Sequence, residues 1–409
     1  MAGIPLSANQ EWRENWRTVL AAAFGMSTGV LYLYSAGTLV IPIEKSTGWS
    51  RAEIGMGLTV VTIITVVISP LTGALIDKFG ARPLALFGIT LFPAAFAAIG
   101  LTGDSIGSWI FHWALLAVLA FGMSPATWTS AVTNLFDRSR GLALAVTMSG
   151  MGIGSLTIPL VSQLLVEAVG WRMTFFWLGA IWGGIGLPLV YFLLRDGRSG
   201  PRDSSFKETV RPPGLPLRES LLSRQYFAIL GAALCFTFVA MSFVVSIVPI
   251  LVWQGVDATQ AAALASLFGI TAIIGRLATG FLLDCFDARV VTTIAMVLPI
   301  AAVSLLWSMP SVITLAALSI MIMGFSLGAE VDAIAYLVSR YFGVRNYALL
   351  FAISGSASAL ATASAPLASG LIYDATGGYS LLLAIMLFPC AISAIAIATL
   401  GRPKEFGSG

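Results

Sequence analysis

The sequence predicts an all-α membrane protein with twelve transmembrane helices, arranged as two six-helix halves. The first observation is composition: 58% of the residues are hydrophobic, 10% are charged, and the mean hydropathy is +0.92. A soluble domain carries about 25% charged residues, so this chain has too little polar surface for a soluble fold. The second observation is a series of apolar runs near the roughly 20 residues that cross a bilayer core. The third is an internal repeat.

The repeat is a short motif in which glycine, aspartate and arginine recur at a constant offset of 207 residues. The first copy contains Gly73, Asp77 and Arg82, and the second contains Gly280, Asp284 and Arg289. Each copy lies where an apolar run ends and a charged loop begins. An internal repeat defines an architecture before other features do, so we interpret the chain as two tandem halves.

The apolar runs follow one another in two sets of six. The runs of the first half begin near Trp16, Ile54, Leu84, Gly107, Leu142 and Thr174, and those of the second half near Tyr226, Ala258, Val290, Ser311, Ala348 and Tyr379. The longest polar stretch lies between the sets and contains a Pro-Pro-Gly turn signal at Pro212. We therefore predict a six-helix half over 1–194, a linker over 195–224, a second half over 225–404, and a cloning scar over 405–409.

The basic residues predict the orientation of these helices. Outside the apolar runs, every Lys and Arg except Lys45, Arg51 and Arg172 falls on the side of the chain ends and the linker. Loops rich in Lys and Arg stay in the cytoplasm, so both termini and the linker are predicted to be cytoplasmic. The first 15 residues are polar, and no signal peptide is expected. We expect a multi-pass protein of the inner (plasma) membrane.

Sequence motifs of catalysis and cofactor binding are missing from the chain. It has no phosphate-binding Gly-Lys-Ser/Thr loop, no nucleophile with a positioned base, and no metal-ligand spacing. Its three cysteines lie in or beside apolar runs and predict no disulfide framework. We therefore expect no enzyme activity, no cofactor, no metal and no nucleic-acid partner, and we expect a monomer in the lipid bilayer.

The whole pattern resembles the major facilitator superfamily of transporters. The motif at Gly73–Arg82 looks like the signature loop of that superfamily, and the copy at 280–289 like its degenerate partner. The stretch Phe136–Ala145, the glycines of 149–154 and Gly170-Trp171-Arg172 resemble the branch of monocarboxylate and oxalate/formate porters. The resemblance implies two halves that alternate in access and a substrate cavity near the bilayer midplane.

This sequence departs from that branch at three places. The first span has no lysine over Tyr32–Gly37, Ala272 stands where mammalian-type monocarboxylate carriers have an aspartate, and Phe351–Ile372 has no second cation. Lactate-type coupling and dicarboxylate recognition therefore do not transfer directly from the family.

Three ionisable residues lie well inside apolar runs: Arg276, Glu330 and Asp332. An ionisable group near the bilayer centre costs roughly 2.5–3.5 kcal/mol to insert, so it is kept for a partner or a task. Arg276 lies about 12 Å from the cytoplasmic end of its helix at 1.5 Å per residue. Its guanidinium matches a carboxylate, and the resembled porters bind the substrate anion with an arginine in this span. The alternative is a structural ion pair with Glu330 or Asp332.

Glu330 and Asp332 are two residues apart and therefore face different sides of one helix. We expect one of them to carry the coupled proton, because a low-dielectric site favours the neutral form of a carboxyl group. The other could hold a cytoplasmic gate through Arg289. Asp332 is preferred for the cavity, because it shares a face with Tyr336, and Glu330 for the gate.

The remaining candidates follow from the resemblance. Spans one, four and seven line the cavity of this superfamily, so aromatic residues there could hold an apolar or aromatic acid, with packing as the alternative for each. The substrate-contact candidates besides Arg276 are Tyr32, Tyr34, Trp128, Phe243, Tyr336 and Ser358. The gating candidates are Gly73, Asp77, Arg82, Gly280, Asp284 and Arg289, with contacts between the halves as the expectation and fixed topology as the alternative.

The sequence thus predicts a secondary transporter that moves a monocarboxylate-type organic anion, with protons as the co-substrate in symport. The alternatives are a proton-coupled drug or metabolite exporter, an organic anion exchanger, and a membrane receptor that does not transport. Arg276 favours the anion carriers over the exporter, because exporters of cations prefer acidic residues in the pocket.

Overall fold

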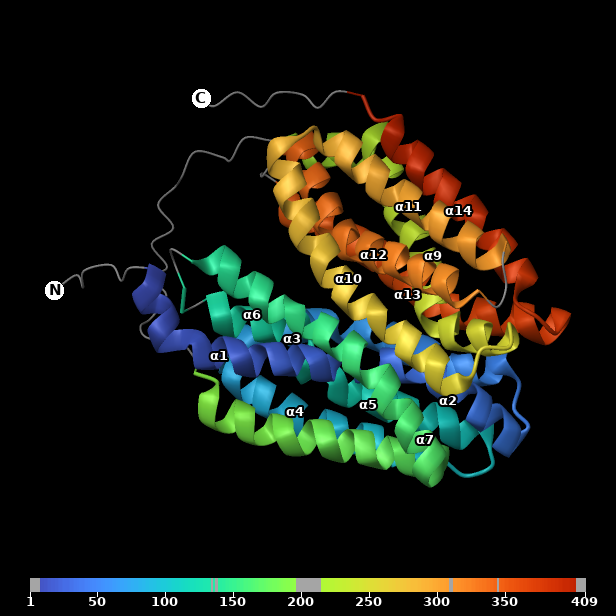
Figure 1. The fold of residues 1–409 in the computed structure, drawn as a ribbon. Coiled ribbons are helices and arrows are strands. Elements are labelled where there is room, and N and C mark those ends of the chain that lie inside the picture. Colours follow the sequence, from blue (N-terminus) through green and yellow to red (C-terminus); the bar gives the residue numbers. More distant parts are fainter. Residues whose placement is uncertain are drawn as a thin grey trace. The chain divides into compact units, whose positions relative to one another are not determined.

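The structure is a computed structural model that describes residues 8–133, 135–136, 139–195, 215–308, 312–343 and 346–401. Helices account for nearly all of these residues, and Figure 1 shows coiled ribbons throughout. The chain divides into two compact units, one of Met1–Trp49 and Glu53–Gly200 and one of Ser50–Ala52 and Pro201–Gly409. Most of the predicted linker and all of the predicted scar lie outside the described residues.

The first unit contains helices α1 to α7. Their bounds are α1 Ala8–Gly29, α2 Leu31–Thr47, α3 Arg51–Phe79, α4 Ala81–Ala98, α5 Ile106–Leu119, α6 Pro125–Thr133 and α7 Arg140–Leu193, with 3-10 turns at Ile99–Leu101 and Ala120–Met123. The first predicted span is broken between α1 and α2, and the fourth between α5 and α6. The helix α7 holds two spans, because Gly170 adopts φ 76° and ψ 167°, a conformation that favours glycine and turns the chain sharply.

The second unit contains helices α8 to α14. Their bounds are α8 Leu217–Leu221, α9 Arg224–Trp253, α10 Ala258–Cys285, α11 Ala288–Ser308, α12 Ile313–Phe342, α13 Tyr347–Thr376 and α14 Ser380–Ala398. The short helix α8 lies in the stretch that was predicted to be a linker, and no helix was expected there. The described part of the chain has eleven helical stretches long and apolar enough to span a membrane, and Gly170 divides one of them. The twelve-helix fold is therefore confirmed.

Corresponding helices pair in the same way inside each unit. In the first unit, α7 packs against α1 and against α4; in the second, α13 packs against α9 and α14 against α11. Because α7 contains both the fifth and the sixth span, these pairings match the repeat that the sequence indicates.

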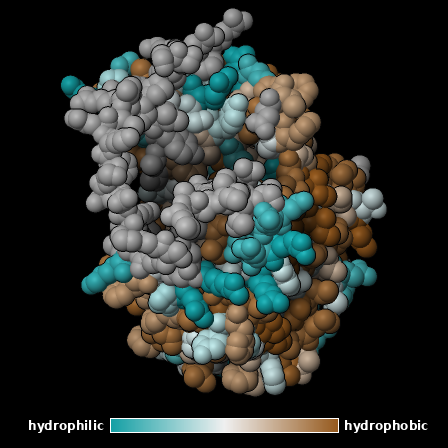
Figure 2. Space-filling model, turned by 90° about the vertical axis from the view of Figure 1, so that its left-hand side faces the viewer, coloured by the Kyte–Doolittle hydropathy of each residue, from teal (hydrophilic) through white to brown (hydrophobic). Residues whose placement is uncertain are grey.

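Figure 2 shows hydrophobic residues in brown along the right-hand side of this face, beside hydrophilic residues in teal. Large hydrophobic side chains such as Phe192, Phe281 and Phe388 are more than two-thirds exposed. Contiguous apolar surface on this scale is uncommon on soluble monomers and fits contact with lipid. The structure therefore describes a multi-pass membrane protein.

Candidate functional site

The candidate site lies where α10 and α12 approach each other most closely in the second unit. A side-chain carbon added at Gly275 would collide with the backbone of Phe325, and one added at Gly328 would collide with Ala272 and with the backbone nitrogen of Arg276. Small residues permit this backbone approach in membrane helices. Gly328 therefore lets the α10 backbone at Ala272 and Arg276 lie directly against α12.

Asp332 lies one turn after Gly328 on the same face of α12, and it forms an ion pair with Arg276. The distance from Arg276 Nε to Asp332 Oδ2 is 3.7 Å, and the two side chains are 19% and 35% exposed. The contact is long for a charge-assisted hydrogen bond, which spans about 2.7–2.9 Å. The exposed fractions show that the pair is partly accessible, and the length of the contact shows that Nε and Oδ2 do not form a short hydrogen bond.

Glu330 faces a different neighbour, as its separation from Asp332 predicted. It is 5% exposed, and its Oε1 accepts a hydrogen bond from Thr237 Oγ1 of α9 at 3.2 Å. Thr237 was not among the predicted site residues, because a threonine in an apolar span is common. The contact considered between Glu330 and Arg289 is not formed here. Within the described residues, Arg289 Nη1 instead donates to the carbonyl oxygen of Leu400 at 2.9 Å.

The aromatic candidates differ in their surroundings. Trp128 and Phe243 are fully buried, and the Trp128 ring occupies the space into which a side chain at Gly25 would point. Both residues therefore lie in packing positions in this conformation. Tyr32 is half-buried, and its ring lies edge-on to Phe92 of α4, with 6.4 Å between the ring centroids.

Tyr34, Tyr336 and Ser358 are each half-buried. Tyr336 lies one turn after Asp332 on α12, where it packs against a small apolar cluster of α10, α11 and α12. Phe243 and Ser358 also belong to the second unit. Tyr32, Tyr34 and Trp128 belong to the first unit.

The two loop arginines of the repeat make equivalent contacts, each inside its own unit. Arg82 Nη2 donates to the carbonyl oxygen of Tyr191 at 3.0 Å, in the last turn of α7. Arg289 donates to that of Leu400, just beyond the end of α14. Cations stabilise the negative end of a helix dipole, so each arginine ties the third helix of its half to the sixth. A gating role for Arg82 and Arg289 stays a prediction, and so does the alternative of fixed topology.

The other gating candidates lie on the adjoining helices. Gly73 and Asp77 are near the end of α3, and Gly280 and Asp284 are near the end of α10. A side chain at Gly280 would meet no atom within 4 Å. The environments of Gly73 and of the Asp77 and Asp284 side chains lie outside the described part of the structure.

Comparison with known proteins places the chain in a family. The model of the Major Facilitator Superfamily matches residues 18–256 and 238–408. The chain is 24% identical over 347 residues to the uncharacterized MFS-type transporter YhjX of Escherichia coli, covering 82% of this chain and 83% of that protein. A solved bacterial homolog of the human lysosomal transporter Spinster has the same fold, with a TM-score of 0.71, 17% identity, and coverage of 93% of this chain and 94% of that one.

Two further relatives match parts of the chain and confirm the resemblance to the monocarboxylate and oxalate/formate branch. Human monocarboxylate transporter 11 is 29% identical over 236 residues, which cover 54% of this chain and 46% of that protein. The oxalate:formate antiporter of Oxalobacter formigenes is 30% identical over 180 residues, with coverage of 43% and 41%. The matched family spans most of the chain, its relatives are transporters, and the twelve-helix fold agrees with it. The protein is therefore a member of the Major Facilitator Superfamily, and a transport protein rather than an enzyme.

Proposed function

We propose that the protein is a secondary transporter of a monocarboxylate-type organic anion, coupled to proton symport in a bacterial inner membrane with both termini cytoplasmic. The observation that carries this proposal is the ion pair of Arg276 and Asp332 inside membrane-spanning helices, with side chains 19% and 35% exposed. The similarity to monocarboxylate transporter 11 supports the substrate class.

The charge balance of the pair suggests how a proton and an anion are coupled. Before substrate binds, the guanidinium and the Asp332 carboxylate neutralise each other. When a proton binds Asp332, the guanidinium can exchange that partner for the substrate carboxylate, and the site keeps its net charge. Entry of the anion alone would leave one uncompensated negative charge in a low-dielectric environment, which costs several kcal/mol. Coupling therefore follows from the cost of unpaired charge.

Arginine suits this exchange better than lysine does. Its planar fork can bind a carboxylate through two parallel hydrogen bonds, whereas the contact of Nε with Asp332 Oδ2 is 3.7 Å long. A substrate carboxylate with bidentate geometry would therefore compete well for the guanidinium. Alternating access would then carry the neutral assembly of substrate and proton across the membrane.

The substrate is proposed to be a monoanion with an apolar or aromatic body. Arg276 is the one basic residue inside the apolar runs, and the eleventh span has no cation for a second carboxylate. Tyr336 lies one turn after Asp332 on α12 and offers an aromatic surface with a polar end. A desolvated second carboxylate without a partner would be costly, so dicarboxylates are expected to bind poorly.

The proposal is tested by uptake into proteoliposomes with and without an inward proton gradient. Wild type should accumulate substrate only with the gradient. Asp332→Asn should lose accumulation but keep counterflow exchange, because a neutral residue leaves Arg276 available to the anion without needing a proton. Glu330→Gln is the matched control and should still accumulate substrate. Full accumulation by Asp332→Asn would exclude this carboxylate as the proton carrier.

An organic anion exchanger is the second candidate, favoured by the similarity to the oxalate:formate antiporter. In an exchanger, Arg276 would pair with Asp332 only in the interval between the release of one anion and the binding of the next. Counterflow without any response to a proton gradient in wild type would favour this alternative.

A further inference from the structure

The first unit has an apolar groove on its surface between α4 and the part of α7 after Gly170. Its volume is about 760 Å³, and its lining includes Pro93, Ala97, Phe176 and Gly184. Phe176 is 48% exposed. In a protein surrounded by lipid, such a groove is open to hydrocarbon chains rather than to water.

The shape of the groove follows from its glycines. Gly179 brings α7 into contact with α4, because an added side-chain carbon would collide with the Pro93 carbonyl oxygen. Five residues further along α7, a carbon added at Gly184 would meet no atom within 4 Å. The helices therefore touch at Gly179 and leave an unfilled space beside Gly184.

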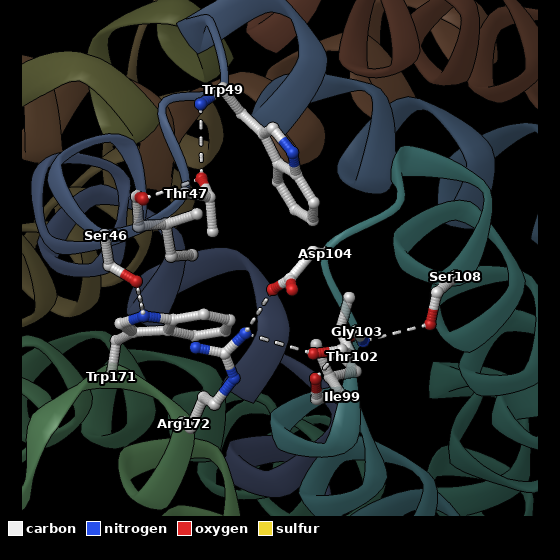
Figure 3. Close-up of polar contacts among 11 residues, drawn as sticks. Ser46, Thr47, Trp49, Ile99, Thr102, Gly103, Asp104, Ser108, Trp171 and Arg172 are labelled. Atoms are coloured by element: carbon white, nitrogen blue, oxygen red, sulfur yellow. Dashed lines mark hydrogen bonds and ion pairs between the residues drawn. The ribbon is translucent and has the colours of Figure 1, made fainter.

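One end of the groove carries a fixed cation, shown in Figure 3. Arg172 lines the groove, and its guanidinium lies over the ring of Trp171, 4.3 Å from the centroid. The ring is itself held by a 2.8 Å hydrogen bond from Trp171 Nε1 to Ser46 Oγ. Arg172 Nη2 also donates to the carbonyl oxygen of Thr102 at 3.3 Å.

The carboxylate of Asp104 lies beside the Arg172 guanidinium. Asp104 Oδ1 is 3.6 Å from Arg172 Nη2, and the Asp104 side chain is fully exposed. An exposed ion pair of this kind contributes little to stability, so both charges are available to a ligand at small cost. In the described part of the chain, Nη2 is the guanidinium nitrogen that contacts both Asp104 and the Thr102 carbonyl oxygen. Nη1 and Nε can therefore donate to a further acceptor.

The geometry points to a binding site for a zwitterionic aminophospholipid of the phosphatidylethanolamine type. An acyl chain occupies the apolar groove, the phosphate binds Arg172, and the primary ammonium group binds Asp104. Arginine can bind a phosphate through two parallel charge-assisted hydrogen bonds. The adjoining carboxylate selects the headgroup, because it repels a net anionic lipid and can accept hydrogen bonds from a primary amine but not from choline.

The test measures retained lipid by native mass spectrometry after purification in mild detergent and exchange into defined lipids. Equal amounts of phosphatidylethanolamine, phosphatidylglycerol and phosphatidylcholine with matched acyl chains are supplied. Wild type should retain phosphatidylethanolamine several-fold more than either competitor. Asp104→Asn should lose that preference while still binding phospholipid, and Arg172→Gln should lose the bound lipid.

Filling the groove gives an independent test. Gly184→Leu should abolish lipid retention, because the new side chain enters unoccupied space without touching the protein. Gly231→Leu in α9 is the matched control, since an added carbon there also meets no atom within 4 Å, and it should retain the lipid. Circular dichroism verifies the helical fold of each variant. Equal retention of the three lipids by wild type, or unchanged retention by Gly184→Leu, would overturn the assignment.

Discussion

Neutralising Arg276 and Asp332 together distinguishes a structural ion pair from a transport site. The pair is 3.7 Å apart, so its direct Coulomb energy is about 4.5 kcal/mol at an effective dielectric constant of about 20. Partial exposure of both side chains and the cost of desolvation reduce the net value. Either Arg276→Gln or Asp332→Asn should therefore destabilise the protein by about 1–3 kcal/mol, because each removes the ion-pair partner of one partly buried charge.

The double variant Arg276→Gln/Asp332→Asn should recover most of that loss, since removal of both charges is often close to neutral for stability. The assay is a thermal-unfolding scan in one detergent at one heating rate, paired with uptake in proteoliposomes. We expect unfolding temperatures near wild type for the double variant but no substrate accumulation. Recovery of both stability and transport would refute the reasoning, because it would make the pair structural alone.

Three further predictions concern the surroundings of the site and its specificity. Thr237→Val should lower stability by about 1–3 kcal/mol in a thermal scan, because Glu330 loses a buried hydrogen-bond donor, and Thr237→Ser should restore it. Gly328→Leu should reduce the yield of folded protein in size-exclusion chromatography, because the side chain collides with α10, whereas Gly280→Leu should be tolerated; equal yields would contradict the close packing. In competition assays, benzoate-like monoacids should inhibit uptake more strongly than oxalate, and tight binding of oxalate alone would reject the monoanion assignment.

Much of the fold could be predicted from hydropathy and the repeat. Spans of about 20 apolar residues have few alternatives in a bilayer, since backbone groups must be satisfied inside the span. The break between α1 and α2 and the one between α5 and α6 were not predicted, because apolar residues continue through both. The fifth and sixth spans were predicted as separate helices, and in the structure they are joined directly at Gly170. The positive φ of this glycine marks the turn between them.

The candidate site was predictable in part. Helical geometry correctly separated Glu330 from Asp332, because side chains two residues apart point to different neighbours. The partners themselves depend on helix packing, so Thr237 could not be identified from the sequence. Likewise, the sequence pattern of an aromatic residue in an apolar span is the same whether the residue lines a cavity or packs in a core. Trp128 was a candidate for substrate contact, and it is fully buried.

The central claim is that proton and anion together replace the ion pair, and proton uptake during substrate binding tests it most directly. Calorimetry of the purified protein at neutral pH, repeated in buffers with different ionisation enthalpies, measures that uptake. Wild type should take up about one proton per bound substrate, and Asp332→Asn should take up none while still binding the anion. Substrate binding without proton uptake in wild type, or identical uptake in Asp332→Asn, would contradict the account.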